Sequence, residues 1–371
     1  MMKVAVIGAY PDSIMSFRGA MIKAMVDAGH DVLVMSAPAS AKVVKDVESL
    51  GARFQAYDVQ RNGLNPIADL KTFWQLRNML KSFQPDKVLA YTIKPVIWGG
   101  LACRLHRNVE FYGLITGLGY AFEKGSLLRN LVNGLVKFLY RISLKKARHV
   151  IFQNNDNLAL FVKLALCKDA QTKRVHGSGV SLSHYPFTPL PEQPPTFLLI
   201  ARLLGDKGIR EYVAAAETVK KSYPDCRFVL VGPEDSSPDK IEMSLIHQWH
   251  EQGVIEYLGE TKNVLPFIQS CHVYTLPSYH EGLPRTVLEA MSVGRPILTT
   301  DAVGCRETVI DNRNGRLVKV KDSQALAEAM QWFLANQEQW GEMASASREF
   351  ATELFDADKV NTEILSILNL N

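Results

Sequence analysis

The sequence PSYHEGLPRTVLEAMSVGRPIL, residues 277–298, joins a predicted buried strand to a predicted helix. The apolar run that ends at Leu276 is typical of a central strand of a parallel sheet. Pro277 and Gly282 interrupt this run with a loop, and Pro284 is the kind of residue that stands in the first turn of a helix. Strand, loop and helix in this order predict an α/β domain.

Two carboxylates flank the predicted step from loop to helix, Glu281 just before the helix and Glu289 inside it. The peptide N–H groups around Gly282, Leu283 and Arg285 carry partial positive charge at the helix start and suit an anion, above all a phosphate. The carboxylates can accept hydrogen bonds from hydroxyl groups on either side. A diphosphate that carries a sugar at each end needs this combination of amides and carboxylates.

The spacing Glu-x7-Glu of Glu281 and Glu289 lies within PS-x2-EG-x-P and is followed by A-M-x3-G-R-P and by G-x2-E at 304–307. This pattern resembles the signature of the retaining, nucleotide-sugar-dependent glycosyltransferases of family 4. The resemblance covers the whole chain. It implies the α/β GT-B fold, two doubly wound Rossmann-like domains that face each other across a cleft.

The bulk properties of the 371 residues agree with two domains in an ordinary globular protein, with 47% apolar and 22% charged residues. The five cysteines are odd in number and scattered, which favours a reducing compartment and argues against a structural zinc site. The N-terminus, MMKVAVIGAY, has no apolar segment of the signal-peptide kind, and no run of about 18 apolar residues occurs. We expect a cytoplasmic protein.

The charge is unevenly distributed along the chain. Residues 1–188 hold 25 Lys and Arg against 12 Asp and Glu, whereas residues 189–371 hold 17 against 26. The first half should therefore face something anionic, either nucleic acid or a membrane surface. The stretch SLLRNLVNGLVKFLYRISLKKAR, 126–148, combines apolar residues at helical spacing with a basic face, which favours an interfacial membrane helix. A core helix with a solvated basic side is the alternative.

The domain limits follow from the apolar runs and the prolines. The short runs KVAVIG and DVLVM, joined by a helical stretch, predict the start of a doubly wound sheet. The first domain is expected over 1–185 and the second over 196–355. The proline-rich stretch 187–195 is expected to link them, and part of the C-terminal helix 356–371 should pack back on the first domain. The first turn, GAYPDSIMSFRG, lacks the Gly-x-Gly-x2-Gly pattern of dinucleotide-binding proteins.

Two cations of the first domain are candidate ligand contacts. The resemblance places Arg18, with Ser16, where the first turn lines the cleft; a salt-bridged arginine on a helix is the alternative. Lys94 follows the predicted strand KVLAY in what we expect to be a loop at the carboxyl end of that strand, and an ammonium there can contact a phosphate or a sugar diphosphate. An ordinary surface lysine is the competing interpretation. Around Gly117 and Gly119, where many family members carry a histidine or an acid, no side-chain base is evident.

The second domain offers a clearer set of candidate ligand-binding residues. Arg202 and Lys207 follow the predicted strand TFLLIA on a glycine-containing loop and can both reach one diphosphate. The resemblance assigns them that role. It places Leu258 near the nucleobase and the helix start with Pro284 near the phosphates. It gives Glu281 the hydroxyls of the donor sugar and Glu289 those of the ribose.

The resemblance implies transfer of a sugar with retained configuration, without metal or other cofactor. The N-terminal features look most like those of bacterial transferases that extend a polyprenyl-diphosphate-linked sugar, often from UDP-N-acetylhexosamines or UDP-galactose, as peripheral proteins of the inner membrane face. No nucleic acid partner is expected. Three alternatives stay open: a UDP-sugar epimerase of the same architecture, an NAD-dependent oxidoreductase, and a non-catalytic nucleotide-sugar-binding protein.

Overall fold

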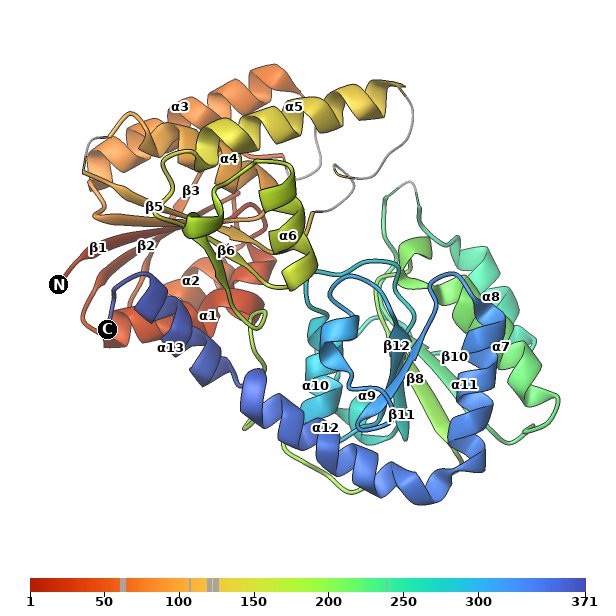
Figure 1. Cartoon of the computed structure of the whole chain (residues 1–371). Helices are drawn as coiled ribbons and strands as arrows, with labels where there is room; N and C mark the ends of the chain where they lie inside the picture. Colours follow the sequence, from red (N-terminus) through yellow and green to blue (C-terminus); the bar gives the residue numbers. More distant parts are fainter. Residues whose placement is uncertain (61–64, 107, 119–121, 123–126, 238) are drawn as a thin grey trace. The chain divides into compact units, whose positions relative to one another are not determined.

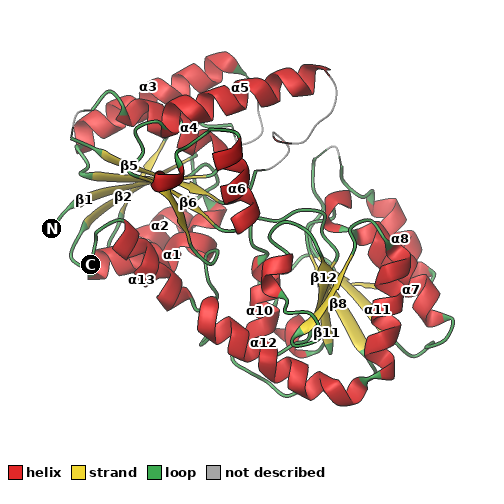
Figure 2. Ribbon diagram, in the orientation of Figure 1, coloured by secondary structure: helices red, strands yellow, loops and turns green. Residues whose placement is uncertain are grey.

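The computed structural model describes residues 1–60, 65–106, 108–118, 122, 127–237 and 239–371. The chain divides into two compact units (Figure 1). Unit 1 consists of Met1–Ser178 and Ala357–Asn371, and unit 2 of Gly179–Asp356. In each unit, helices enclose a parallel sheet (Figure 2), which confirms the prediction of Rossmann-like α/β domains.

The sheet of unit 1 has the strand order β3-β2-β1-β4-β5-β6-β7, and every pair of neighbours is parallel. The order reverses between β1 and β4, and ligands commonly bind at the carboxyl ends of the strands beside such a point. The strands are β1 (Lys3–Ile7), β2 (Asp31–Ser36), β3 (Arg53–Ala56), β4 (Lys87–Tyr91), β5 (Glu110–Ile115), β6 (His149–Phe152) and β7 (Thr172–Arg174).

Apolar cores lie on both faces of this sheet. One core contains side chains of α3, α4, α5 and α6, and the other contains side chains of α1, α2 and α13. These helices are α1 (Asp12–Asp27), α2 (Ala41–Ser49), α3 (Pro66–Phe83), α4 (Ile93–Cys103), α5 (Leu127–Leu144), α6 (Asn155–Lys163) and α13 (Ala357–Ile367). The last helix, α13, packs against α1.

The sheet of unit 2 is again parallel, in the order β10-β9-β8-β11-β12-β13. Its strands are β8 (Thr196–Ile200), β9 (Arg227–Val231), β10 (Glu256–Tyr257), β11 (Val273–Leu276), β12 (Ile297–Thr300) and β13 (Gly315–Val318). Its helices are α7 (Ile209–Lys220), α8 (Met243–Glu251), α9 (Leu265–Gln269), α10 (Arg285–Val293), α11 (Ser323–Ala335) and α12 (Trp340–Leu354).

The proline-rich stretch 187–195 is fixed to unit 2 by a buried arginine. Arg295 is fully buried, and its guanidinium donates hydrogen bonds to the carbonyl oxygens of Thr188, at 2.8 Å, and Pro189, at 3.2 Å. The Arg295 Nε also donates to the Ile268 carbonyl at 2.9 Å. Arg295, the arginine of the G-R-P part of the motif, therefore connects the end of α10 with the stretch 187–195, which leads into β8.

In unit 1, one sequence-based prediction about local structure is wrong and another is confirmed. The residues after β4 form no loop: α4 begins at Ile93, so Lys94 lies in a first helical turn, where Pro95 is also tolerated. The predicted helix in 126–148 is present as α5. Gly119, near which a catalytic side chain was sought in the sequence, lies outside the described residues.

None of the helices in the described part of the chain combines the length and hydrophobicity needed to cross a bilayer.

Candidate active site

The loops that follow β8 and β11 meet at the carboxyl edge of the sheet of unit 2. Gly208, at the start of α7, has a left-handed backbone with φ of +70°. A Cβ atom there would lie 2.2 Å from the carbonyl oxygen of Pro277, so only glycine permits this approach. The Tyr279 amide donates to the Asp206 carbonyl oxygen at 2.9 Å, which fixes the same contact from the other side.

This contact brings Lys207 and Glu281 together. The Lys207 ammonium lies 2.7 Å from Oε1 of Glu281, and the buried Ser278 hydroxyl donates to the same oxygen at 2.8 Å. The second carboxylate oxygen, Oε2, accepts no hydrogen bond from the residues that the structure describes. Lys207 and Ser278 thus hold Glu281 by one oxygen and leave the other available to a hydroxyl group.

The charge of Lys207 is secured by its surroundings. Its side chain is only 13% exposed, and burial on its own would lower the pKa of the ammonium group. The carboxylates of Glu281 and Asp206 outweigh burial and raise the pKa above its ordinary value. Burial raises the pKa of Asp206, and Lys207 offsets only part of this. Lys207 is therefore a permanent cation at neutral pH.

Arg202 lies on the same loop after β8 and is more open to solvent. Its side chain is 46% exposed, and its Nη1 lies 2.6 Å from Oδ2 of Asp235, which follows β9. Asp235 is held in turn by the Ser237 amide, which donates to its other oxygen at 2.8 Å. The guanidinium keeps donors beyond this one contact, because it carries five N–H groups in total.

The backbone beside Glu281 is supported by the loop that follows β12. The Glu281 amide donates to the Val303 carbonyl oxygen at 2.9 Å. Gly304 has φ of +77°, and a Cβ atom on it would lie 2.5 Å from the carbonyl oxygen of Glu281 and 2.6 Å from that of Gly282. The glycine of the G-x2-E pattern is thus needed for close packing beneath the site.

Helix α10 begins directly after the loop that carries Glu281, with Pro284 at its N-cap and its first turn starting at Arg285. Arg285 donates through Nε to Oε1 of Glu289, one turn later, at 2.8 Å. The Glu289 side chain is only 6% exposed, and burial raises its pKa, although Arg285 and Tyr185 act in the opposite direction. Leu283 packs on the core beneath the helix.

Leu258 lies just after β10 and is exposed at the same edge of the sheet. Its amide donates to the Leu230 carbonyl oxygen at 3.0 Å, which continues the β9–β10 pairing by one residue. The following Gly259 is left-handed, with φ of +75°. The Leu258 side chain therefore presents an apolar surface beside the end of β9.

The two candidate cations of unit 1, Arg18 and Lys94, each contact a different set of residues. The Arg18 side chain is buried, lies over the Tyr91 ring at 5.1 Å, and donates to the Ser178 hydroxyl at 3.1 Å. The Lys94 ammonium lies 2.6 Å from a carboxylate oxygen of Asp69, which comes from α3. Each cation thereby connects two parts of unit 1.

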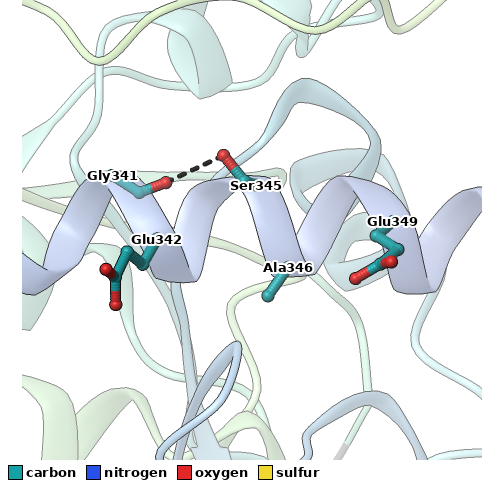
Figure 3. Close-up of a pocket in the computed structure, with 5 residues that line it drawn as sticks. All are labelled: Gly341, Glu342, Ser345, Ala346 and Glu349. Carbon is teal, nitrogen blue, oxygen red and sulfur yellow. Dashed lines mark hydrogen bonds between the residues drawn. The ribbon is translucent and has the colours of Figure 1, made fainter.

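Elsewhere in the described part of the chain, neither a metal-binding cluster nor a second converging site is found. Within the described residues, no group of three or more His, Cys, Asp and Glu side chains is placed to hold a metal ion. A shallow depression runs along α12 (Figure 3), but its lining comes from one helix, so groups from different elements do not converge there. Its lining residues are Gly341, Glu342, Ser345, Ala346 and Glu349.

The two Rossmann-like units have the architecture of the GT-B glycosyltransferases. Residues 184–350 match the family "Glycosyl transferases group 1", and residues 9–154 match "Glycosyl transferase 4-like". The chain belongs to the group 1 glycosyltransferases, also called family 4, as the motifs predicted.

Named relatives support the same class. An N,N'-diacetylbacillosaminyl-diphospho-undecaprenol alpha-1,3-N-acetylgalactosaminyltransferase of Campylobacter jejuni is 29% identical over 340 residues, 88% of this chain and 87% of the relative. A UDP-Gal:alpha-D-GlcNAc-diphosphoundecaprenol alpha-1,3-galactosyltransferase of Escherichia coli is 26% identical over 279 residues, 71% of this chain and 70% of the relative.

Solved structures show the fold. Sucrose-phosphate synthase from Thermosynechococcus elongatus superposes with a TM-score of 0.81 at 19% identity, over 100% of this chain and 98% of the other. HepE from Anabaena, solved with UDP and glucose, superposes with a TM-score of 0.80 at 18% identity, over the full length of both chains. The fold prediction is confirmed.

Several residues of the constellation were not expected from the sequence. Asp235 pairs with Arg202, Asp206 lies beside Lys207, and Tyr185 contributes to the surroundings of Glu289. Sequence separation hides Asp235 and Tyr185, because each comes from a different segment than its partner, whereas Asp206 directly precedes Lys207 in the sequence. Ser278 did carry a signal, since it is the serine of the PS-x2-EG pattern.

Proposed function

We propose that this glycosyltransferase moves a hexose or N-acetylhexosamine from a UDP-sugar to a polyprenyl-diphosphate-linked sugar, with retained anomeric configuration. The observation that carries the proposal is the meeting of Lys207, Ser278 and Glu281 at the carboxyl edge of unit 2. The two named relatives, whose names give diphospho-undecaprenol-linked sugars as acceptors, support the acceptor class. The E. coli relative is named for a UDP-sugar donor.

The proposed chemistry uses charge rather than metal. The bond between the anomeric carbon and the donor's diphosphate breaks, and negative charge grows on the leaving oxygen. Lys207, Arg202 and the amides at the start of α10, beside Gly282 and Arg285, would stabilise that charge, a contribution often among the largest in catalysis. The acceptor's hydroxyl oxygen forms the new bond on the same side of the ring, and its proton passes to a leaving phosphate oxygen.

The two glutamates would hold the donor at its ends. Oε2 of Glu281 would accept a hydrogen bond from a hydroxyl of the transferred sugar, because its partner oxygen is already engaged. Glu289 would accept from the ribose beside Arg285. Leu258 would pack against the base. No divalent cation is required in this scheme, since cationic side chains take its place.

We also propose that the enzyme works at the cytoplasmic face of the membrane, as a peripheral protein bound through residues 126–148. A lipid-linked acceptor and the basic first half of the chain support this location. Replacing Lys145, Lys146 and Arg148 by glutamate should weaken sedimentation with anionic vesicles. Unchanged sedimentation would contradict the role of this segment.

The decisive experiment combines the purified protein with a panel of UDP-, GDP- and TDP-sugars and with polyprenyl-diphosphate-linked monosaccharide and disaccharide acceptors. Mass spectrometry of the lipid should show the gain of one sugar with a UDP donor. Isomerised UDP-sugar in the absence of acceptor would instead identify an epimerase. Tight UDP-sugar binding without any product would identify a non-catalytic binding protein.

A further inference from the structure

Helix α5 (Leu127–Leu144) exposes an apolar stripe on the surface of unit 1. Leu131, Leu135 and Phe138 are spaced i, i+4 and i+7, and their exposed fractions lie between 54% and 72%. This spacing puts the three side chains on one side of the helix. The deeper side, with Tyr140 and Leu144, belongs to the core.

Helix α3 (Pro66–Phe83) carries a second stripe that the sequence did not lead us to expect. Ile67, Leu70 and Trp74 are spaced i, i+3 and i+7 and are between 48% and 79% exposed. Soluble monomers seldom leave large apolar side chains exposed in groups, and groups of this kind mark contact surfaces. Two such stripes on one unit call for a common explanation.

The two stripes belong to one layer of the fold. Helix α4 packs against both α3 and α5, and the three helices cover the same side of the seven-stranded sheet (Figure 1). Each helix follows a strand of a parallel sheet and therefore starts at the carboxyl edge of that sheet. Both stripes occupy the N-terminal two thirds of their helices, so both lie toward this edge, where α/β sheets bind ligands.

The charges beside the stripes indicate the partner. Lys81 at the end of α3, and Lys145 and Lys146 after α5, are exposed. The Arg77 guanidinium lies over the Trp74 ring at 5.3 Å, so cation and indole are presented together. Apolar groups bordered by lysine and arginine suit an anionic lipid surface, in which tryptophan prefers the interface.

We propose that α3 and α5 together form the membrane-binding face of the protein, with an anionic lipid bilayer as its partner. The stripe of α3 inserts beside that of α5, while Lys81, Lys145 and Lys146 bind lipid headgroups. This inference deepens the proposed function and rests on it for the lipid-linked acceptor. It turns one interfacial helix into a membrane-binding face made of two helices.

The test measures binding of the full chain to vesicles of phosphatidylcholine with phosphatidylglycerol, without any substrate. Leu70→Ser combined with Trp74→Ser should lower the partition coefficient about tenfold or more, since two apolar side chains leave the lipid contact. Leu105→Ser is the matched control: Leu105 is 56% exposed in the same helix layer but follows α4 and belongs to neither stripe. Its binding should equal that of the wild type.

Three results would overturn the inference. Unchanged binding of the α3 double variant would remove α3 from the face. An equal loss with Leu105→Ser would show that the loss of binding is not specific to the two stripes. Loss of a dimer in the α3 variant, without any vesicle binding by the wild type, would show that the stripe covers a second copy of the chain.

Two further measurements separate this inference from the proposed function. Quenching of tryptophan fluorescence by brominated lipid should lose its strongest component in Trp74→Phe, a readout that needs no activity. Transfer to a short-chain, water-soluble acceptor should stay within about twofold of the wild type in the Leu70→Ser/Trp74→Ser variant, because its site in unit 2 is intact. Normal vesicle binding with no transfer to any acceptor would refute the proposed function alone.

Discussion

Both units place cations at the carboxyl edges of their sheets, but the cations have different neighbours. In unit 2, Lys207 is paired with Glu281, a residue predicted to bind substrate. In unit 1, Lys94 is paired with Asp69 of the neighbouring helix α3, and the pair ties that helix to α4. A diphosphate can compete for Lys207 without opening the fold, whereas a ligand at Lys94 must break a contact that joins two helices. Position at a strand end therefore does not by itself make a cation part of a site.

The largest effect should come from removing the carboxylate at the centre of the unit 2 constellation. Glu281→Gln keeps the shape of the side chain but loses the charge that accepts a sugar hydroxyl and balances Lys207. We expect kcat to fall by about 100-fold or more, the range seen when one group of a preorganised polar site is removed. Steady-state kinetics with a lipid-linked acceptor measures this.

Glu342→Gln is the matched control, because Glu342 lies on the exposed surface of α12. Its kcat should equal that of the wild type, and both variants should melt within a few degrees of it. Nearly normal turnover by Glu281→Gln would place the reaction elsewhere.

The same substitution at two lysines tests the comparison directly. Lys207→Met should lower kcat by about 100-fold, since it removes a cation from the leaving diphosphate. Lys94→Met should instead lower the free energy of unfolding by about 1–3 kcal/mol, because the largely buried Asp69 loses its partner. Activity per folded molecule should stay within about threefold of the wild type.

A second variant separates the two roles of Lys94. Lys94→Met combined with Asp69→Leu should recover most of the lost stability, since no unpaired carboxylate remains. If the double variant is stable but transfers poorly, the phosphate contact predicted for Lys94 from the sequence gains support, and the contrast between the units fails.

A smaller effect is expected at Ser278, which positions Glu281. Ser278→Ala removes one of the two donors on Oε1, while Lys207 keeps the other. One hydrogen bond to a charged group corresponds to about a tenfold change, so kcat should fall about tenfold. Ser345→Ala, which removes an exposed hydroxyl from α12, should have no effect. Equal activity of both variants would show that Lys207 alone holds the carboxylate.

Much of this architecture could be predicted because buried strands have a local signature. Apolar runs such as KVAVIG and KVLAY identify central parallel strands, and they occur as β1 and β4. The start of α4 could not be placed, because Pro95 suits the first turn of a helix as well as a loop. The pairing of Lys207 with Glu281, 74 residues apart, depends on the close approach that Gly208 permits to Pro277. Such an approach has no signal in the local sequence.

Exposure is harder to predict than secondary structure. Helix α3, Pro66–Phe83, has apolar residues at helical spacing, yet this pattern does not reveal that Trp74 faces outward. An apolar residue at helical spacing fits a buried face equally well, and only the packing of α3 on α4 decides between them. The same limit applies to Arg295, whose burial reflects carbonyl partners that come from three separate segments.

The smallest effect tests the second glutamate, which differs from Glu281 in its burial. Burial raises the pKa of Glu289 from its ordinary value of 4.5, so the folded chain holds this proton more tightly than the unfolded chain does. Stability from this group is therefore greatest below pH 4.5 and declines as pH rises through the folded pKa. Glu289→Gln removes this dependence, because an amide does not titrate.

Urea unfolding of the wild type and of Glu289→Gln, followed from pH 4 to pH 7.5, should show the wild type losing stability relative to the variant as pH rises. Donor KM should increase about three- to tenfold in the variant, because an amide is a weaker acceptor for a ribose hydroxyl than a carboxylate. Parallel stability curves would show that Arg285 and Tyr185 neutralise the effect of burial. In that case the difference between the two glutamates would lie only in which end of the donor they hold.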